Sequence, residues 1–237
     1  MQKNMTLLQH FVELRRRVMW SLVWFAAAFG IGWFVAPALQ EFLTRPLLSA
    51  WGDGIMLYTA VTDGLFIQFS LAGLFAIFAT VPAVLWHIWG FVAPGLHAPE
   101  RRFIGPVLIM SPILFLAGTA FAYYFLFPMV FAFFIHMNES APVPAAFLPV
   151  ASNYLYFVID LLKIFGLAFQ LPLVLILLNR VGILSRRAVI KSRRYAVVGA
   201  FIIAAILTPP DVISSIMLAL PLWALFEASI LFMKKEE

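Results

Sequence analysis

Two acidic side chains, Glu13 and Glu100, stand among cations in segments that flank long apolar stretches. Glu13 lies in residues 10–17, His-Phe-Val-Glu-Leu-Arg-Arg-Arg, where apolar residues recur at helical spacing, so an amphipathic helix along a membrane surface is expected. A carboxylate binds a guanidinium through two parallel hydrogen bonds, which an ammonium group cannot reproduce. We therefore predict that the two carboxylates face one surface groove, which selects a peptide carrying consecutive arginines.

A simpler interpretation of each acid is also open. Glu13 could pair with Arg16 or Arg17 one turn further on, which stabilises a helix by only about 0.2–0.5 kcal/mol. Glu100 could cap the helix that follows it, because an acid at a helix N-terminus interacts favourably with the macrodipole.

A second polar set interrupts the fourth apolar stretch. Its members share one stripe of a helix, since they recur at separations of seven, three and seven residues: Asn153, Asp160, Lys163 and Gln170. A charge at mid-membrane costs about 2.5–3.5 kcal/mol on insertion scales. The stripe is therefore predicted to face a polar concavity, although Asp160 and Lys163 could instead pair with each other. Pro172 is expected to kink this helix next to Gln170.

Other polar residues have more ordinary interpretations. Tyr123, in the third stretch, could reach the same concavity or serve only in packing. Asp211, in Leu-Thr-Pro-Pro-Asp, is expected to cap the last helix. The chain has no cysteine, its four histidines are scattered, and it contains no nucleotide-binding, zinc-protease or serine-hydrolase motif. We therefore expect no metal, no cofactor and no enzymatic activity.

The composition is that of a polytopic helical membrane protein. Of 237 residues, 64% are hydrophobic and 11% are charged, whereas soluble domains are about half apolar and a quarter charged. The net charge of +5 would favour a nucleic-acid partner in a soluble protein. Here the cations lie between apolar stretches, so they are topology signals and no nucleic acid is expected.

Six transmembrane helices in a single domain, residues 1–237, are predicted, at about residues 18–39, 67–92, 103–137, 153–178, 195–208 and 212–233. The fifth is too short for the bilayer and Pro221 interrupts the sixth, so the last two helices are expected to be short and to leave a concave, glove-like surface. Pro128 should bend the long third helix and lay its aromatic end along the membrane surface.

Orientation follows from the positive-inside rule. With the N-terminus in the cytoplasm, cytoplasmic segments hold fourteen of the sixteen lysines and arginines, the exceptions being Arg45 and Lys163. Both termini are then cytoplasmic. Residues 40–66 and 138–152 are expected to be loops that form a cap on the outer side.

With these motifs in order, the chain resembles the TatC family, subunits of the twin-arginine protein translocase. The resemblance covers nearly the whole length and rests on five motifs: residues 10–17; Arg-Pro-Leu at 45–47; Trp-Gly-Phe-Val-Ala-Pro-Gly-Leu at 89–96 with the following Glu-Arg-Arg; Phe-Ala-Tyr-Tyr-Phe-Leu-Phe-Pro at 121–128; and Leu-Thr-Pro-Pro-Asp at 207–211. Each motif is weak alone, but their order is specific.

The resemblance implies a receptor in the bacterial cytoplasmic (inner) membrane for folded proteins whose signal peptides carry consecutive arginines. It implies TatA and TatB as single-span partners, several copies in one complex, and transport driven by the proton motive force without nucleotide. The family's signal-binding positions fall on Glu13, Glu100, Arg15 and Phe91. Other sensitive family positions fall on three further residues: Pro46, Tyr123 and Asp211.

Two residues depart from the family pattern. Gln170 and Asp63 stand where the family often has glutamate. Since an amide does not titrate, hydrogen bonding to a partner's helix is the expected role at Gln170. An ion-coupled secondary transporter using Asp160 and Lys163 is the alternative function, whereas an intramembrane hydrolase lacks a nucleophile and base.

Overall fold

The computed structural model describes residues 7–52, 55–92, 104–139, 148–207 and 212–234, and its elements are helices. In chain order they are α1 (Leu7–Trp51), α2 (Asp63–Val92), α3 (Ile104–Phe121), the π-helical turn η3 (Ala122–Leu126), α4 (Phe127–Glu139), α5 (Ala151–Ala168), α6 (Gln170–Arg180), α7 (Arg186–Lys191), α8 (Arg193–Leu207) and α9 (Val212–Phe232).

Among the described residues, five helical stretches are long and apolar enough to cross a membrane: Val12–Trp51, Asp63–Ile88, Gly105–Asn138, Ala151–Arg180 and Val212–Phe232. The fifth predicted span, α8, has 15 residues and so reaches only about 22 Å of the roughly 30 Å of hydrocarbon. The prediction of a short fifth helix is confirmed. That of a short sixth helix is wrong, because α9 runs through Pro221 for 21 residues.

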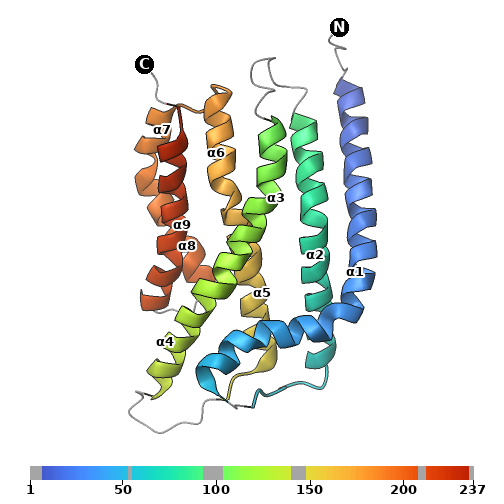
Figure 1. The fold of residues 1–237 in the computed structure, drawn as a ribbon, viewed down its shortest axis with the longest axis vertical. Coiled ribbons are helices and arrows are strands. Elements are labelled where there is room, and N and C mark those ends of the chain that lie inside the picture. Colours follow the sequence, from blue (N-terminus) through green and yellow to red (C-terminus); the bar gives the residue numbers. More distant parts are fainter. Residues whose placement is uncertain (1–6, 53–54, 93–103, 140–147, 208–211, 235–237) are drawn as a thin grey trace.

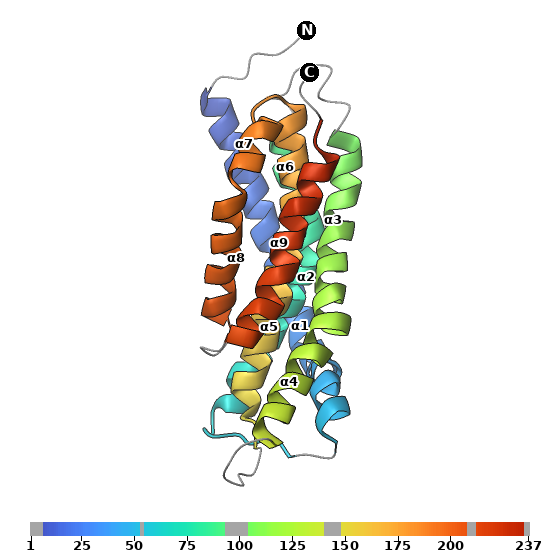
Figure 2. The same ribbon diagram turned by 90° about the vertical axis from the view of Figure 1, so that its left-hand side faces the viewer.

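The helices form two groups joined by α5. Figure 1 shows α1 and α2 on one side and α6, α7, α8 and α9 on the other, with α3 between them and α4 below α8 and α9. Turned by 90°, the same helices show the α8–α9 hairpin ending well above α4 (Figure 2). Buried residues of α5, among them Leu155, Val158 and Phe165, lie in one core cluster with residues of α1, α2, α4, α8 and α9.

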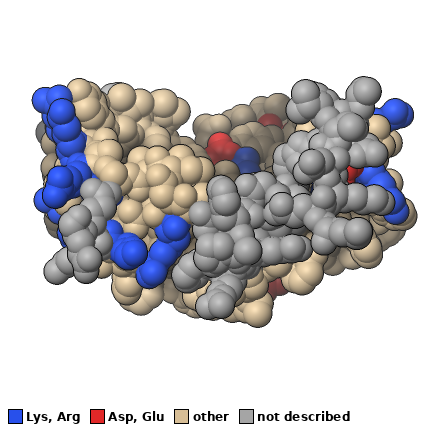
Figure 3. All heavy atoms as spheres, turned by 90° about the horizontal axis from the view of Figure 1, so that it is seen from above, with Lys and Arg blue, Asp and Glu red and all other residues tan. Residues whose placement is uncertain are grey.

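The cations gather at one end of the molecule. The beginning of α1 and the end of α9 lie at the same end in Figure 1, together with α7 and the end of α6. Figure 3 looks at this end and shows lysine and arginine atoms around its rim. For the segments that the structure describes, the prediction that basic residues share one face agrees with the fold, and we refer to this face as the basic end.

Helix α1 continues far beyond its predicted end. Residues 40–51 were expected in a loop, but they are helical despite Pro37 and Pro46 within α1. Figure 1 shows the result, a first part that runs along α2 and a second part that turns across the far end. The loop prediction is wrong there because prolines bend a membrane helix without ending it when other groups satisfy the freed backbone.

Two tyrosines satisfy the backbone of α1 beside Pro46. Pro46 has no N–H to donate to the Phe42 carbonyl four residues earlier. The hydroxyl of Tyr123 donates to that carbonyl at 2.8 Å, and the two aromatic rings stack with centroids 4.3 Å apart. The buried hydroxyl of Tyr154 donates to the neighbouring Leu43 carbonyl at 2.7 Å. The bent part of α1 is therefore held by η3 and α5.

The same compensation occurs at the other proline of α1. Pro37 leaves the Trp33 carbonyl without its helical donor, and Nε2 of Gln68 on α2 approaches that carbonyl at 3.3 Å. Nearby, Gly32 permits the helices to touch, since a Cβ there would lie 2.8 Å from the Ala72 carbonyl oxygen. α1 is thus fixed to α2 at mid-length.

The long third apolar stretch is bent where it was predicted to be. The helix changes to a π-helical turn over η3, and Pro128 follows at once in α4. The π turn closes with the N–H of Phe127 donating to the Ala122 carbonyl. Phe131 beyond the bend does not lie on a membrane surface as expected, because it is buried with its ring 5.2 Å from that of Tyr154.

The described parts of the two segments that were expected to form an outer cap are joined by backbone hydrogen bonds. The N–H of Leu57 donates to the Pro149 carbonyl at 3.0 Å, and the N–H of Ala151 donates to the Leu57 carbonyl at 2.8 Å. These bonds make an isolated parallel bridge between Leu57 and Val150. The segments preceding α2 and α5 therefore meet below the bent part of α1.

Helices α3 and α5 cross closely because both carry glycine at the contact. A Cβ at Gly118 would lie 2.5 Å from the Phe165 carbonyl oxygen, and a Cβ at Gly166 would lie 2.6 Å from the Phe115 ring. Small residues let membrane helices approach in this way. The crossing positions the break between α5 and α6, which falls at Phe169, three residues before Pro172.

The tyrosine contacts predict a stability difference between neighbouring residues. Tyr154→Phe removes a donor from a buried carbonyl and should lower the unfolding free energy by about 1 kcal/mol, or the Tm by roughly 2–4 °C. Tyr123→Phe should act in the same direction. The control is Tyr124→Phe, whose hydroxyl is exposed, and thermal unfolding in detergent is the measurement. An equal loss in Tyr124→Phe would contradict the carbonyl contacts.

The glycine contact predicts that Gly118→Ala destabilises the protein by about 1–3 kcal/mol, since the new methyl group meets backbone that cannot move away. Gly30→Ala is the control, because nothing lies within 4 Å of its Cβ position. Alanine should leave Tm unchanged or raise it there, because it favours helix by about 0.5–1 kcal/mol. Similar Tm values for both variants would disprove the close crossing.

Candidate functional site

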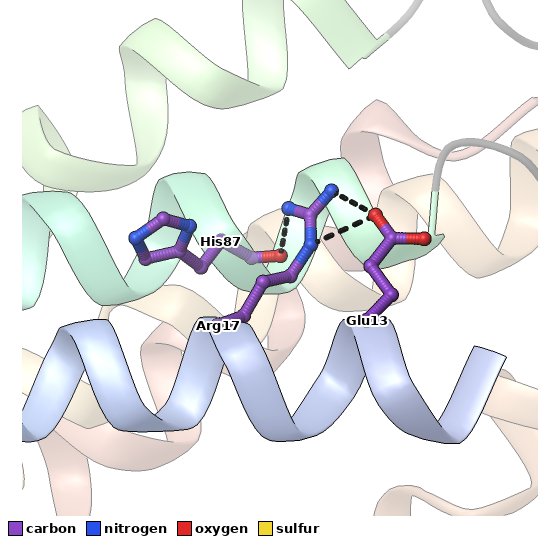
Figure 4. A network of polar contacts seen from close by, with 3 residues as sticks. All are labelled: Glu13, Arg17 and His87. Atoms are coloured by element: carbon purple, nitrogen blue, oxygen red, sulfur yellow. Dashed lines mark hydrogen bonds and ion pairs between the residues drawn. The ribbon is translucent and has the colours of Figure 1, made fainter. Parts of the chain in front are cut away.

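Glu13 and Arg17 form an ion pair at the basic end of α1 (Figure 4). Nη2 of Arg17 lies 2.5 Å and Nε lies 3.0 Å from Oε1 of Glu13. The third donor, Nη1, binds the His87 carbonyl oxygen on α2 at 3.0 Å. The predicted alternative that Glu13 pairs one turn along its helix is confirmed for Arg17, and the guanidinium also joins α1 to α2.

The pair is shielded from solvent but remains accessible. The side chains of Arg17 and Glu13 are 24% and 26% exposed. Both of the donated bonds end on Oε1, and Figure 4 shows Oε2 directed away from Arg17. Arg17 therefore contacts one oxygen of the carboxylate through two of its nitrogens.

An apolar slot of about 420 Å³ descends from this pair between α1 and α2. Arg17 and His87 line the slot near the basic end, and its other lining residues include Val18, Leu22 and Val84. Thr80 also lines the slot, and its buried hydroxyl has no hydrogen-bond partner among the described residues. The site thus combines a charged entrance with an apolar interior.

Three other residues were predicted for signal binding. Arg15 lies on α1 two residues from each member of this pair, so it projects from the opposite side of the helix, and it is exposed. Phe91 lies in the last turn of α2, one turn beyond His87, but its side chain is outside what the structure describes. Glu100 lies outside the described residues, so its approach to Glu13 stays a prediction. The structure does bring Glu13 to the end of α2 from which the segment carrying Glu100 leaves.

Gln170 is buried and hydrogen-bonded twice to one residue of α3. The hydroxyl of Ser111 donates to Oε1 of Gln170 at 2.6 Å, and Nε2 of Gln170 donates to the Ser111 carbonyl at 2.7 Å. Each end of the amide therefore has a partner within the chain. This arrangement joins the break between α5 and α6 to α3.

Asp160 and Lys163 bind each other on α5. Nζ of Lys163 lies 2.6 Å from Oδ1 of Asp160, and the side chains are 35% and 52% exposed, respectively. The predicted alternative of a mutual pair is confirmed. The pair neutralises both charges, which lowers the cost of placing them at membrane depth.

The concavity beside α8 is apolar. A hollow of about 730 Å³ lies between α5, α6, α8 and α9, and Gln170 is the one polar side chain among its described lining residues. The prediction of a polar concavity is wrong for these residues. The four members of the stripe separate because α5 ends at Ala168, so that Gln170 turns to Ser111 while Asn153 is exposed.

Two further predicted positions, Pro46 and Tyr123, lie at the far end from Glu13. Pro46 and Tyr123 belong to the bend of α1 described above, where Tyr123 contacts α1 rather than the polar stripe. Asp211 lies outside the described residues. Within the part of the chain that the structure describes, no group of three or more acidic or histidine side chains could hold a metal ion.

Sequence reasoning missed three contributors, Ser111, Tyr154 and His87. Ser111 and Tyr154 are 59 and 111 residues from their partners, so helical spacing could not indicate them. His87 contributes a backbone carbonyl, which no side-chain pattern reveals. The position of Phe42 four residues before Pro46 was a usable signal, since it identifies which carbonyl needs an outside donor.

Comparisons with known proteins agree on one family. Residues 9–221 match the family described as "Sec-independent protein translocase protein (TatC)". A relative from Magnetococcus marinus, "Sec-independent protein translocase protein TatC", is 37% identical over 98% of this chain and 84% of that protein. A relative of the same description from Escherichia coli strain K12 is 34% identical over 95% of this chain and 87% of that protein.

A solved structure has the same fold. The crystal structure described as "Twin Arginine Translocase Receptor- TatC in DDM" superposes with a TM-score of 0.87 at 31% sequence identity. The match covers 95% of this chain and 99% of that chain. Both the sequence and the arrangement of helices are therefore shared over nearly the whole length.

The Ser111–Gln170 contact predicts coupling between the two residues. Ser111→Ala and Gln170→Leu should each lower stability, and the double variant should lose less than the sum by about 0.6–1.7 kcal/mol, the range found for hydrogen bonds between membrane helices. Chemical unfolding of the four proteins in mixed micelles measures this coupling. Additive losses would show that the two side chains do not interact.

Proposed function

Because the chain belongs to the TatC family of Sec-independent protein translocase proteins, we propose that it is the translocase subunit that receives twin-arginine signal peptides. The observation that carries this proposal is the Glu13 carboxylate, which binds a guanidinium through Nε and Nη2 at the edge of an apolar slot. Signal peptides join a cationic segment to an apolar one, and the site offers a counterpart to each.

Two acids on separate segments suit two consecutive arginines. In an extended peptide, adjacent side chains point to opposite faces, so neighbouring guanidinium groups diverge. One carboxylate on α1 and another on the segment after α2 could receive one arginine each. Glu13 and Glu100 are the two proposed receptors, and Arg15 and Phe91 are further proposed contacts of the signal peptide.

The proposed setting is the bacterial inner membrane, with both termini in the cytoplasm. The basic end would then face the cytoplasm under the positive-inside rule. We propose TatA and TatB as single-span partners, with several copies of this chain in one complex. Transport would draw on the proton motive force rather than on a reaction catalysed by this chain.

The apolar hollow beside the short α8 is a place for a partner's helix. Gln170 at its wall already has its hydrogen bonds within the chain, so such a helix would pack mainly through apolar contacts. Gln170 stands where the family often has glutamate, and in the resting chain the amide forms its hydrogen bonds without a group that can titrate. The alternative of an ion-coupled transporter has less support, because Asp160 and Lys163 neutralise each other.

The proposal predicts that Glu13→Ala or Glu100→Ala abolishes photocrosslinking of a twin-arginine signal peptide, while the protein still inserts into the membrane. The matched control is Glu41→Ala, which removes an exposed carboxylate from the other end of α1. Crosslinking that persists in both site variants would refute the proposed groove. A signal in which lysines replace the arginines should crosslink poorly to the unmodified chain.

A further inference from the structure

The Arg17 guanidinium occupies the same carboxylate that the proposed receptor would offer to a signal peptide. Nε and Nη2 of Arg17 both donate to Oε1 of Glu13. An arginine of a signal peptide would present the same two donor groups to this carboxylate. We infer that Arg17 is a resident occupant of the signal site and that an arriving arginine competes with it for Glu13. This inference rests on the proposed function.

Arg17 can release Glu13 without leaving its place between the helices. Its Nη1 donates to the His87 carbonyl on α2, which is a separate contact on the other side of the guanidinium (Figure 4). The His87 carbonyl, and the contact of the Arg17 aliphatic chain with the slot, hold the Arg17 side chain when the Glu13 carboxylate binds an arginine of the peptide. The exchange therefore needs only side-chain rotation, and α1 stays attached to α2.

The resident occupant also explains how the empty site is stable. A partly buried carboxylate without a partner is costly, and Arg17 supplies the missing charge and donors when no signal is present. An arriving arginine replaces one guanidinium by another, so the net interaction is small and reversible. Such exchange suits a receptor that must later release its ligand.

Competition has a quantitative signature. An occupied site reduces the apparent affinity of every ligand by the fraction of time that the site is open, whatever the ligand is. A partly exposed ion pair contributes at most about 1 kcal/mol, which corresponds to roughly fivefold in affinity. Removing Arg17 should therefore raise the affinity for an arginine peptide and for a lysine peptide by the same factor.

The test measures binding of two fluorescent synthetic peptides to the purified full-length chain in detergent. Each peptide carries an apolar segment, preceded by two arginines in one and by two lysines in the other. We expect Arg17→Gln to tighten the binding of both peptides by up to about fivefold and to leave the ratio of their affinities unchanged. The matched control is Arg16→Gln, which removes an equal charge at an exposed neighbouring position and should have a smaller effect.

Two results would overturn the inference. One is weaker binding by Arg17→Gln, as expected if Arg17 only supports the site, and the other is a change no larger than that of Arg16→Gln. If Arg17→Gln fails to fold, Arg17→Lys decides the question, because it keeps the charge but loses the two-donor contact. It should tighten both peptides about twofold to threefold, and unchanged or weaker binding rejects the competition.

Failure of the proposed function has a different outcome. In that case the unmodified chain binds the two peptides equally, and Glu13→Gln changes neither affinity. If instead arginine is preferred and Glu13→Gln weakens binding, but Arg17→Gln does not strengthen it, the receptor function stands and the resident occupant is rejected.

Discussion

Backbone groups freed by proline must find new partners inside a membrane, and this requirement determines the course of α1. No water is available in hydrocarbon to bind an orphaned carbonyl. Gln68 approaches the carbonyl freed by Pro37, and Tyr123 donates to the one freed by Pro46. α1 can therefore bend across the far end of the molecule and still remain a helix. These donors come from α2 and η3.

The proposed signal site lies on this same helix. Arg17 attaches α1 to α2 near the basic end, Gln68 attaches it at mid-length, and Tyr123 and Tyr154 hold its bent part. These four attachments place Glu13 beside the end of α2, from which the segment with Glu100 departs. Attachments along the whole of α1, including those at its bent part, thereby support the position of the Glu13 carboxylate.

The sequence predicted features that depend on local spacing and missed those that depend on distant partners. The bend before Pro128, the short α8 and the pairing of Glu13 with Arg17 each follow from a few adjacent residues. The extension of α1 to Trp51 was not predictable from its own prolines, because the compensating donors lie on α2, η3 and α5. The apolar hollow was likewise missed, since Gln170 turns toward Ser111 on another helix.

The central claim is that the Glu13 carboxylate receives an arginine of the signal peptide. Solid-state NMR on the chain in lipid bilayers tests this most directly, with ¹³C at the Glu13 carboxyl and ¹⁵N in the guanidinium groups of a bound twin-arginine peptide. The account predicts strong dipolar dephasing between these two labels, which reports direct contact. No dephasing under conditions in which the peptide is bound would contradict the account.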